Sequence, residues 1–253
     1  MKKLIVANWK MNPATLERAK AIAADSRKSA GALKKTTLVL CPPFVYLSEF
    51  SKMKAKNFYL GAQDVFWQEE GSYTGEISPS MLKNLGVKYA IVGHSERRRY
   101  LDETDVMVNK KIKAALRSGL KVILCVGEEK RDSGTEFLKF IRSEIGEALK
   151  GVPRKLLKNL IMAYEPIWAI GKKGEDADTP EDAVEMALYI RKCLVPFVGK
   201  EAAGRIPVLY GGSVDPKNAA GFLETGISGL LVGHESLVPG HFAEILKIAD
   251  GVK

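Results

Sequence analysis

Eight short apolar runs recur along the chain, and an amphipathic stretch separates each run from the next. The runs are rich in β-branched residues and almost continuously hydrophobic, which is typical of strands buried on both faces of a parallel sheet. We therefore expect eight strands, at Leu4–Ala7, Thr37–Cys41, Phe58–Ala62, Tyr89–Val92, Val122–Val126, Leu160–Tyr164, Val208–Tyr210 and Gly229–Val232.

The stretches between these runs have helical spacing of apolar residues, and some carry end signals. Thr179 can cap a helix that has Pro180 at its first position, and Gly119 follows another helix as a C-cap glycine does. We expect helices at Thr15–Ala30, Phe44–Lys54, Ser78–Leu85, Asp105–Ser118, Glu136–Leu149, Pro180–Val198, Asn218–Glu224 and Phe242–Ala249.

Eight strands alternating with eight helices in 253 residues predict an α/β fold, a closed parallel (β/α)8 barrel that forms one domain over 1–253. The alternative is an open, doubly wound sheet, because the number of elements favours closure without demonstrating it. One connection stands apart from the others. Pro166–Asp178 is long, contains glycine and leads from a strand to a well-capped helix, so we interpret it as a flexible lid.

The net charge of +9 does not indicate a nucleic-acid protein, because the basic residues are scattered over helical patterns without interleaved aromatic residues. A positive field would also favour a small anionic substrate. No apolar run approaches the ~18–20 residues of a membrane helix. The apolar stretch at Leu4–Ala7 is too short for a signal peptide, so we expect a cytoplasmic protein.

The three cysteines, Cys41, Cys125 and Cys193, are widely spaced and odd in number. They match neither a disulfide framework nor a CxxC metal site, and we expect Cys41 and Cys125, which end apolar runs, to be buried structural thiols. With only three histidines and no His/Cys cluster, we predict no metal site.

Polar and glycine-rich segments follow five of the predicted strands at their C-terminal ends, where barrel enzymes place their active sites. These segments are Asn8-Trp9-Lys10, Gly93-His94-Ser95-Glu96, Glu165-Pro166, Gly211-Gly212-Ser213 and Gly233-His234.

Each segment offers a chemical group. Glu165 directly follows an apolar strand. Burying a carboxylate there is unfavourable unless the group has a catalytic function or is paired. His94 precedes a helix-like stretch, and a helix N-terminus lowers the pKa of a histidine and leaves a neutral, hydrogen-bonding imidazole. Lys10 can stabilise a phosphate or a developing oxyanion. The turns at Gly211 and Gly233 offer backbone N–H groups for a phosphate.

Each of these signals is weak alone. Taken together, a base, an electrophile, a cation and a phosphate grip are what enediol-forming isomerisation of a small phosphorylated sugar requires. The sequence contains no motif for a metal or a nucleotide, so we expect the reaction to need no cofactor.

The chain resembles the triosephosphate isomerase family over essentially its whole length. The resemblance rests on Asn8-Trp9-Lys10-Met11-Asn12, Gly61-Ala62-Gln63, Tyr73-Thr74-Gly75-Glu76, Val92-Gly93-His94-Ser95-Glu96-Arg97-Arg98, Ala163-Tyr164-Glu165-Pro166-Ile167-Trp168-Ala169-Ile170-Gly171 and Tyr210-Gly211-Gly212-Ser213-Val214. It implies a TIM barrel and the interconversion of dihydroxyacetone phosphate and glyceraldehyde 3-phosphate, three-carbon intermediates of glycolysis and gluconeogenesis.

The resemblance also implies roles for single residues. Glu165 would move the proton, His94 would polarise the carbonyl, and Lys10 would stabilise the enediolate. The substrate would be oriented by Asn8 and held at its phosphate by backbone N–H groups. The residues implied for the phosphate are Gly171, Ser213, Gly233 and His234, and those implied to support the site from behind are Ser95, Glu96 and Gly212.

Family members are commonly dimers, so the resemblance implies a homodimer. The loop from Gln63 to Glu76 is similar to the one that reaches the neighbouring subunit. Thr74 would touch Asn8 and Lys10 there, and Gln63 would belong to the same contact.

The sequence departs from the family pattern twice. Gly233-His234 stands where the family has two glycines, and Lys172–Asp178 makes the lid two residues longer. These departures leave open an isomerase of a larger sugar phosphate. A barrel retained only for binding is a further alternative, but its expected sign, loss of Glu165, His94 or Lys10, is absent.

Overall fold

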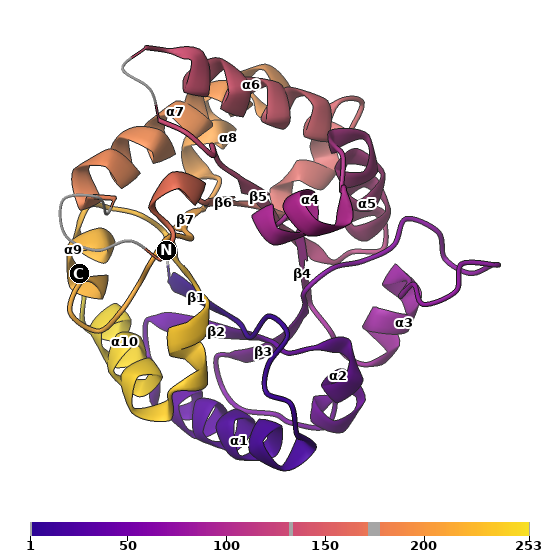
Figure 1. Cartoon of the computed structure of the whole chain (residues 1–253), viewed down its shortest axis with the longest axis vertical. Helices are drawn as coiled ribbons and strands as arrows, with labels where there is room; N and C mark the ends of the chain where they lie inside the picture. Colours follow the sequence, from indigo (N-terminus) through magenta and orange to yellow (C-terminus); the bar gives the residue numbers. More distant parts are fainter. Residues whose placement is uncertain (1, 132–133, 172–177, 253) are drawn as a thin grey trace.

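Eight parallel strands close into a barrel in chain order, and helices surround it (Figure 1). The computed structural model describes residues 2–131, 134–171 and 178–252. Each strand pairs with the next, and β8 pairs with β1. The strands are β1 (Lys3–Asn8), β2 (Thr36–Cys41), β3 (Phe58–Ala62), β4 (Tyr89–Val92), β5 (Lys121–Val126), β6 (Leu160–Tyr164), β7 (Val208–Tyr210) and β8 (Gly229–Val232). The predicted (β/α)8 barrel is confirmed, and the open sheet is excluded.

Every predicted helix is present within the described residues, with shifted ends in six cases. The helices are α1 (Leu16–Ala32), α2 (Phe44–Phe50), α3 (Pro79–Asn84), α4 (Ser95–Leu101), α5 (Asp105–Arg117), α6 (Glu136–Leu149), α7 (Pro180–Val198), α8 (Lys200–Arg205), α9 (Ala219–Glu224) and α10 (Pro239–Gly251). The 3₁₀ segments are η1 (Arg154–Asn159), η2 (Ile167–Ala169) and η4 (His234–Leu237). The prediction missed α8, which follows Gly199 directly after α7 ends. None of the described helices is long and apolar enough to cross a membrane.

The hydrophobic core has two parts because alternate residues of each strand face opposite sides. One part fills the barrel interior and includes Val6, Val39, Ile91 and Ile123. The larger part lies between the strands and the helices. Cys41 and Cys125 are free and buried in the interior, which confirms the prediction of structural thiols.

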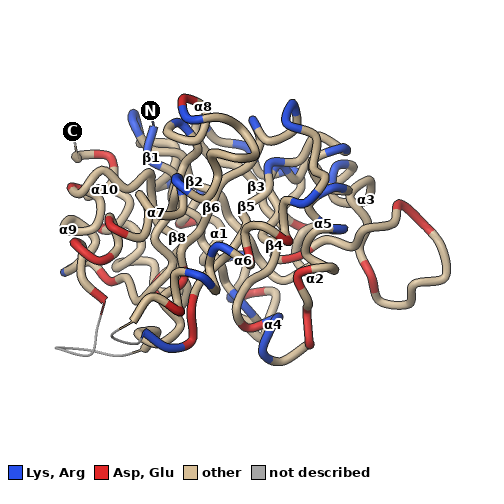
Figure 2. The backbone as a smooth tube through the Cα atoms, turned by 90° about the horizontal axis from the view of Figure 1, so that it is seen from above, with Lys and Arg blue, Asp and Glu red and all other residues tan. Residues whose placement is uncertain are grey.

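Charge is distributed unevenly along the barrel axis. Lys and Arg gather at the edge where β1 begins and α8 lies (Figure 2), and Lys3, Lys121, Lys88 and Arg205 begin or closely precede strands. The helices end at this face, and the negative end of a helix dipole stabilises cations. Much of the positive charge therefore lies opposite the strand ends that carry the polar segments, so the net charge by itself does not make those ends positive.

A buried ion cluster supports one of those ends. The Lys111 ammonium on α5 is 2% exposed and contacts Asp64 at 2.8 Å and Glu103. Glu103 accepts hydrogen bonds from the Gly93 N–H at 3.1 Å and from Arg97 Nε at 2.8 Å. Arg97 also pairs with Asp64 at 2.8 Å. The cluster thus connects the end of β3, α5 and the turn that follows β4.

The substitution Lys111→Met should destabilise the fold, because it removes the more deeply buried of the two cations, Lys111 and Arg97, that pair with the Asp64 and Glu103 carboxylates. Breaking a buried ion pair in this way costs about 3–5 kcal/mol. Urea unfolding followed by circular dichroism measures the loss, with Lys110→Met on the exposed face of α5 as the control. Equal stability of the two variants would contradict this role.

Candidate active site

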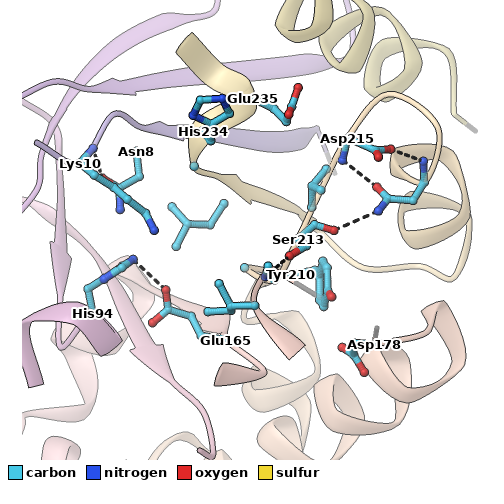
Figure 3. A pocket seen from close by; sticks show the side chains of 18 of the residues that line it. Asn8, Lys10, His94, Glu165, Asp178, Tyr210, Ser213, Asp215, His234 and Glu235 are labelled. Carbon is cyan, nitrogen blue, oxygen red and sulfur yellow. Dashed lines mark hydrogen bonds and ion pairs between the residues drawn. The ribbon is translucent and has the colours of Figure 1, made fainter. Parts of the chain in front are cut away.

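A cavity of about 620 Å³ opens at the C-terminal ends of the strands. It is lined by residues at or just after the ends of five strands, among them Asn8, Lys10, His94, Glu165 and Ser213 (Figure 3). The structure therefore brings together the five polar segments that the sequence analysis identified. Parallel strands make this unavoidable once the barrel closes, because all their C-terminal ends meet at one face.

Glu165 lies at the end of β6 and is 2% exposed. Its Oε1 lies 2.9 Å from His94 Nε2, and its Oε2 accepts the Ser95 N–H at 3.0 Å. Burial raises the pKa of Glu165, but the contacts with His94 and Ser95 and the charge of Lys10 lower it below its ordinary value. The site therefore holds an ionised carboxylate with almost no access to water.

His94 caps α4, where its Nδ1 accepts the Glu96 N–H at 3.2 Å. This hydrogen bond leaves Nε2 as the N–H that faces Glu165. Burial lowers the pKa of His94, but the Glu165 and Glu96 carboxylates raise it above its ordinary value. The predicted lowering of this pKa is therefore wrong for the arrangement seen here, because the prediction considered the helix dipole and left out the carboxylate 2.9 Å away.

Lys10 is held by its backbone as much as by its side chain. It has a positive φ of 53°, which is unusual for a residue with a side chain. Its N–H donates to Asn8 Oδ1 at 3.1 Å, and its carbonyl accepts from Gln63 Nε2 at 2.9 Å. Its ammonium pairs with Glu96 at 2.6 Å. Gln63, predicted only as a dimer contact, thus positions Lys10 within its own chain, which spacing alone could not reveal.

The turn after β7, which carries Ser213, lies on the side of the cavity opposite His94 (Figure 3). The Gly171 N–H donates to Ser213 Oγ at 2.7 Å, which joins the turn after β7 to the connection after β6. Gly212 is required by close packing, since a Cβ there would lie 2.2 Å from Tyr210 Oη. Asn218 Nδ2 donates to the Ser213 carbonyl at 3.0 Å and orders the turn.

His234, at which the sequence departs from the family pattern, is exposed at the start of η4 and lines the cavity (Figure 3). Gly233, the residue before it, lies beside Lys10, and a Cβ at this position would lie 3.4 Å from Lys10 Cε, an ordinary van der Waals distance. Contact with Lys10 therefore does not by itself require glycine at position 233.

The sequence analysis missed a group that holds the connection after β6. Glu128 Oε1 accepts hydrogen bonds from Tyr164 Oη at 2.8 Å and from Trp168 Nε1 at 2.9 Å. The Ile167 N–H donates to the Glu128 carbonyl at 3.1 Å. Glu128 follows β5 much as Glu165 follows β6, and an acidic residue just after an apolar run was the available signal.

Two other predicted features, the Thr74 contact and the lid, stay predictions. Thr74 is exposed on the loop between β3 and α3, which projects beyond the ring of helices (Figure 1). The predicted lid begins with buried Pro166 and the segment η2, but its residues 172–177 lie outside the described residues. Among the residues that the structure describes, no group of three or more His, Cys, Asp or Glu side chains is arranged to hold a metal ion.

An ionised carboxylate, an imidazole N–H and an ammonium that line one cavity together with glycine-rich turns can move a proton between neighbouring carbons of a phosphorylated sugar. Fold and site together define a barrel isomerase of sugar phosphates. The sequence model of the triosephosphate isomerase family matches residues 3–249.

Individual relatives agree with this match. The chain is 47% identical to a triosephosphate isomerase of Thermoanaerobacter sp. (strain X514) over 96% of this chain and 98% of the relative. It is 45% identical to one of Dictyoglomus thermophilum over 97% and 99% of the two chains. The chain belongs to the triosephosphate isomerase family. It interconverts dihydroxyacetone phosphate and glyceraldehyde 3-phosphate, a reaction of glycolysis and gluconeogenesis.

Asp178, which lines the cavity, should make the fold less stable as the pH rises. Burial and the neighbouring Asp182 raise its pKa from 3.8 to about 7, although the charge of Arg131 acts to lower it. The unfolded chain therefore releases this proton first, and stability falls between about pH 4 and 7. Asp178→Asn should gain roughly 2–4 kcal/mol relative to the wild type over this range.

Urea unfolding at pH 4, 5.5, 7 and 8 measures this gain, with Asp25→Asn on the exposed face of α1 as the control. A difference between Asp178→Asn and the wild type that stays constant across these pH values would show that Asp178 is not held in its protonated form.

Proposed function

We propose that Glu165 is the base that moves the proton in this isomerisation. The observation that carries the proposal is a carboxylate that is 2% exposed and nevertheless has a lowered pKa, at the wall of the cavity that faces His94. Such a group is ionised at neutral pH, and its position shields the proton that it receives from bulk water.

His94 and Lys10 supply the electrophilic side of the reaction. With Nδ1 occupied by the Glu96 N–H, His94 presents an Nε2–H donor to the cavity. The Lys10 ammonium, which lies 2.6 Å from Glu96, brings a positive charge to the same wall. Donors arranged before the reaction stabilise negative charge on the substrate oxygens as the enediolate forms. Asn8, which holds the Lys10 N–H, would orient the substrate.

Substrate binding has to replace the contact between Glu165 and His94. A substrate oxygen that accepts the Nε2–H takes the place of the carboxylate, which can then turn toward a carbon. Losing the His94 contact removes the largest influence that lowers the Glu165 pKa, so the carboxylate becomes a stronger base as the substrate enters. The attraction to the Glu165 carboxylate, which raises the His94 pKa, weakens at the same time. This change favours a neutral imidazole.

The phosphate would bind between the turns after β6, β7 and β8. Backbone N–H groups of Gly171, Ser213, Gly233 and His234 are its proposed donors. A phosphate oxygen would take over the Gly171 N–H that Ser213 Oγ accepts at 2.7 Å. This exchange keeps the donor paired in both states.

The variant Glu165→Gln should lower kcat by about 10²- to 10⁴-fold with little change in KM, because the amide keeps the shape and cannot accept the proton. A coupled assay for glyceraldehyde 3-phosphate, run without added metal or cofactor, measures the loss. Glu129→Gln, in the connection after β5, is a control of the same chemistry. Wild-type turnover of Glu165→Gln would disprove the assignment of the base.

We further propose that the chain forms a homodimer in which Thr74 of one subunit touches Asn8 and Lys10 of the other. The projecting loop and a group of exposed apolar side chains support this assembly. Met11 beside Lys10 is 93% exposed, and Val45 at the start of α2 is 78% exposed. Apolar side chains so accessible next to a site indicate a surface that a partner covers.

Thr74→Arg should therefore weaken the dimer and reduce kcat, since a long cation would have to fit beside Lys10. Sedimentation velocity over a range of protein concentrations measures assembly, and the isomerase assay measures activity. The control is Ala24→Arg on the exposed face of α1. A monomeric wild type, or a Thr74→Arg dimer as tight as that of Ala24→Arg, would refute the proposed contact.

The chain would work as one catalytic domain over 1–253 and in the cytoplasm, where glycolytic intermediates occur. The closed barrel supports the first statement, because the proposed catalytic groups come from its first, fourth and sixth strands.

A further inference from the structure

Glu144 on α6 is a buried carboxylate that takes no part in the chemistry proposed above. It is 3% exposed, and a carboxylate in such a position needs partners. Its Oε2 accepts the Gly127 N–H at 3.1 Å, and its Oε1 lies 3.5 Å from Arg98 Nε. Its two oxygens therefore contact two different active-site turns.

The first contact leads to Glu165. Gly127 follows β5 and packs directly on the Glu165 backbone, since a Cβ at Gly127 would lie 1.8 Å from the Glu165 carbonyl oxygen. The Glu165 N–H also donates to the Val126 carbonyl at 2.9 Å. A hydrogen bond that holds the Gly127 N–H thus holds the surface on which the proposed base rests.

The second contact leads to His94. Arg98 Nε donates to the Gly93 carbonyl at 2.9 Å, and Arg98 Nη1 pairs with Asp105 at 2.6 Å. Gly93 has a φ of +74° and immediately precedes His94. Arg98 therefore holds the turn that places the imidazole, and Glu144 lies against the guanidinium from the side of α6.

We propose that Glu144 is a positioning residue that fixes the position of the Glu165 turn relative to the His94 turn. The inference rests on the proposed roles of Glu165 and His94. A carboxylate suits this position because one oxygen satisfies a neutral N–H while the other faces a cation. An apolar residue would leave the Gly127 N–H buried without this acceptor and would remove a counter-charge from Arg98.

The protonation state of Glu144 adds a pH dependence. Burial raises its pKa from 4.5 to about 7, with the charges of Asp105 and Glu165 acting in the same direction and Arg98 and the Gly127 N–H opposing them. Protonation below pH 7 removes the negative charge that faces Arg98. The alignment of the two turns should therefore weaken as the pH falls through 7.

Two substitutions separate these contributions. Glu144→Leu removes both contacts, and we expect kcat to fall roughly 10- to 100-fold with KM changed less than about threefold, because displaced catalytic groups lower turnover. Glu144→Gln keeps an acceptor for the Gly127 N–H and loses the charge, so its loss in kcat should be smaller. Glu147→Leu, an exposed position on the same helix that pairs with Lys150, is the matched control.

The pH profile of kcat from pH 5.5 to 9 provides the second readout. The wild type should show an inflection near pH 7 that Glu144→Gln lacks, and a purely structural role would not produce this difference. Circular dichroism establishes that each variant is folded at the assay temperature. If Glu144→Leu does not fold, the profile of Glu144→Gln decides.

The inference is overturned if folded Glu144→Leu turns over within about twofold of Glu147→Leu, or if Glu144→Gln keeps the wild-type inflection. Failure of the proposed base would look different. In that case Glu165→Gln would be active, whereas failure of this inference leaves Glu165→Gln inactive and Glu144→Leu active.

Discussion

The hydrogen bonds between β1 and β8 close the sheet, and the arrangement at the C-terminal face depends on that closure. Closure brings the turn after β8 to the residue that follows β1, so that Gly233 lies against the aliphatic end of Lys10. An open sheet would leave these two segments at opposite edges. The cation at one end of the chain and the backbone donors at the other face one cavity because the first and last strands pair.

Buried charges hold the turns that the barrel brings together. Glu103, paired with Lys111, accepts a hydrogen bond from the Gly93 N–H. Glu144 contacts Gly127 and Arg98 from α6. Glu128, after β5, accepts hydrogen bonds from Tyr164 and Trp168. Each group is costly to bury and is stable only with its partners in place. The same contacts therefore make the turns rigid, and rigid turns keep catalytic groups in register.

Much of the fold could be predicted from local pattern. Five of the eight strands have the predicted bounds, because apolar runs of this length are distinctive. The segments around His94 and Glu165 were found for a similar reason, since polar residues after apolar strands stand out. Gln63, Glu128 and Glu144 were not assigned the contacts that the structure shows. Their partners are distant in the sequence, and no spacing rule connects them.

The sequence by itself determined which residues form strands, which strand ends carry polar groups and to which family the chain belongs. Only the tertiary structure decided which of these groups meet. The Ser95 N–H and the Glu165 carboxylate are 70 residues apart in the chain and in contact in the fold. The imidazole of His94 lies beside that contact, and together with it lowers the pKa of Glu165 against the effect of burial. Local periodicity encodes burial, whereas a pKa depends on distant charges that folding brings within a few ångströms.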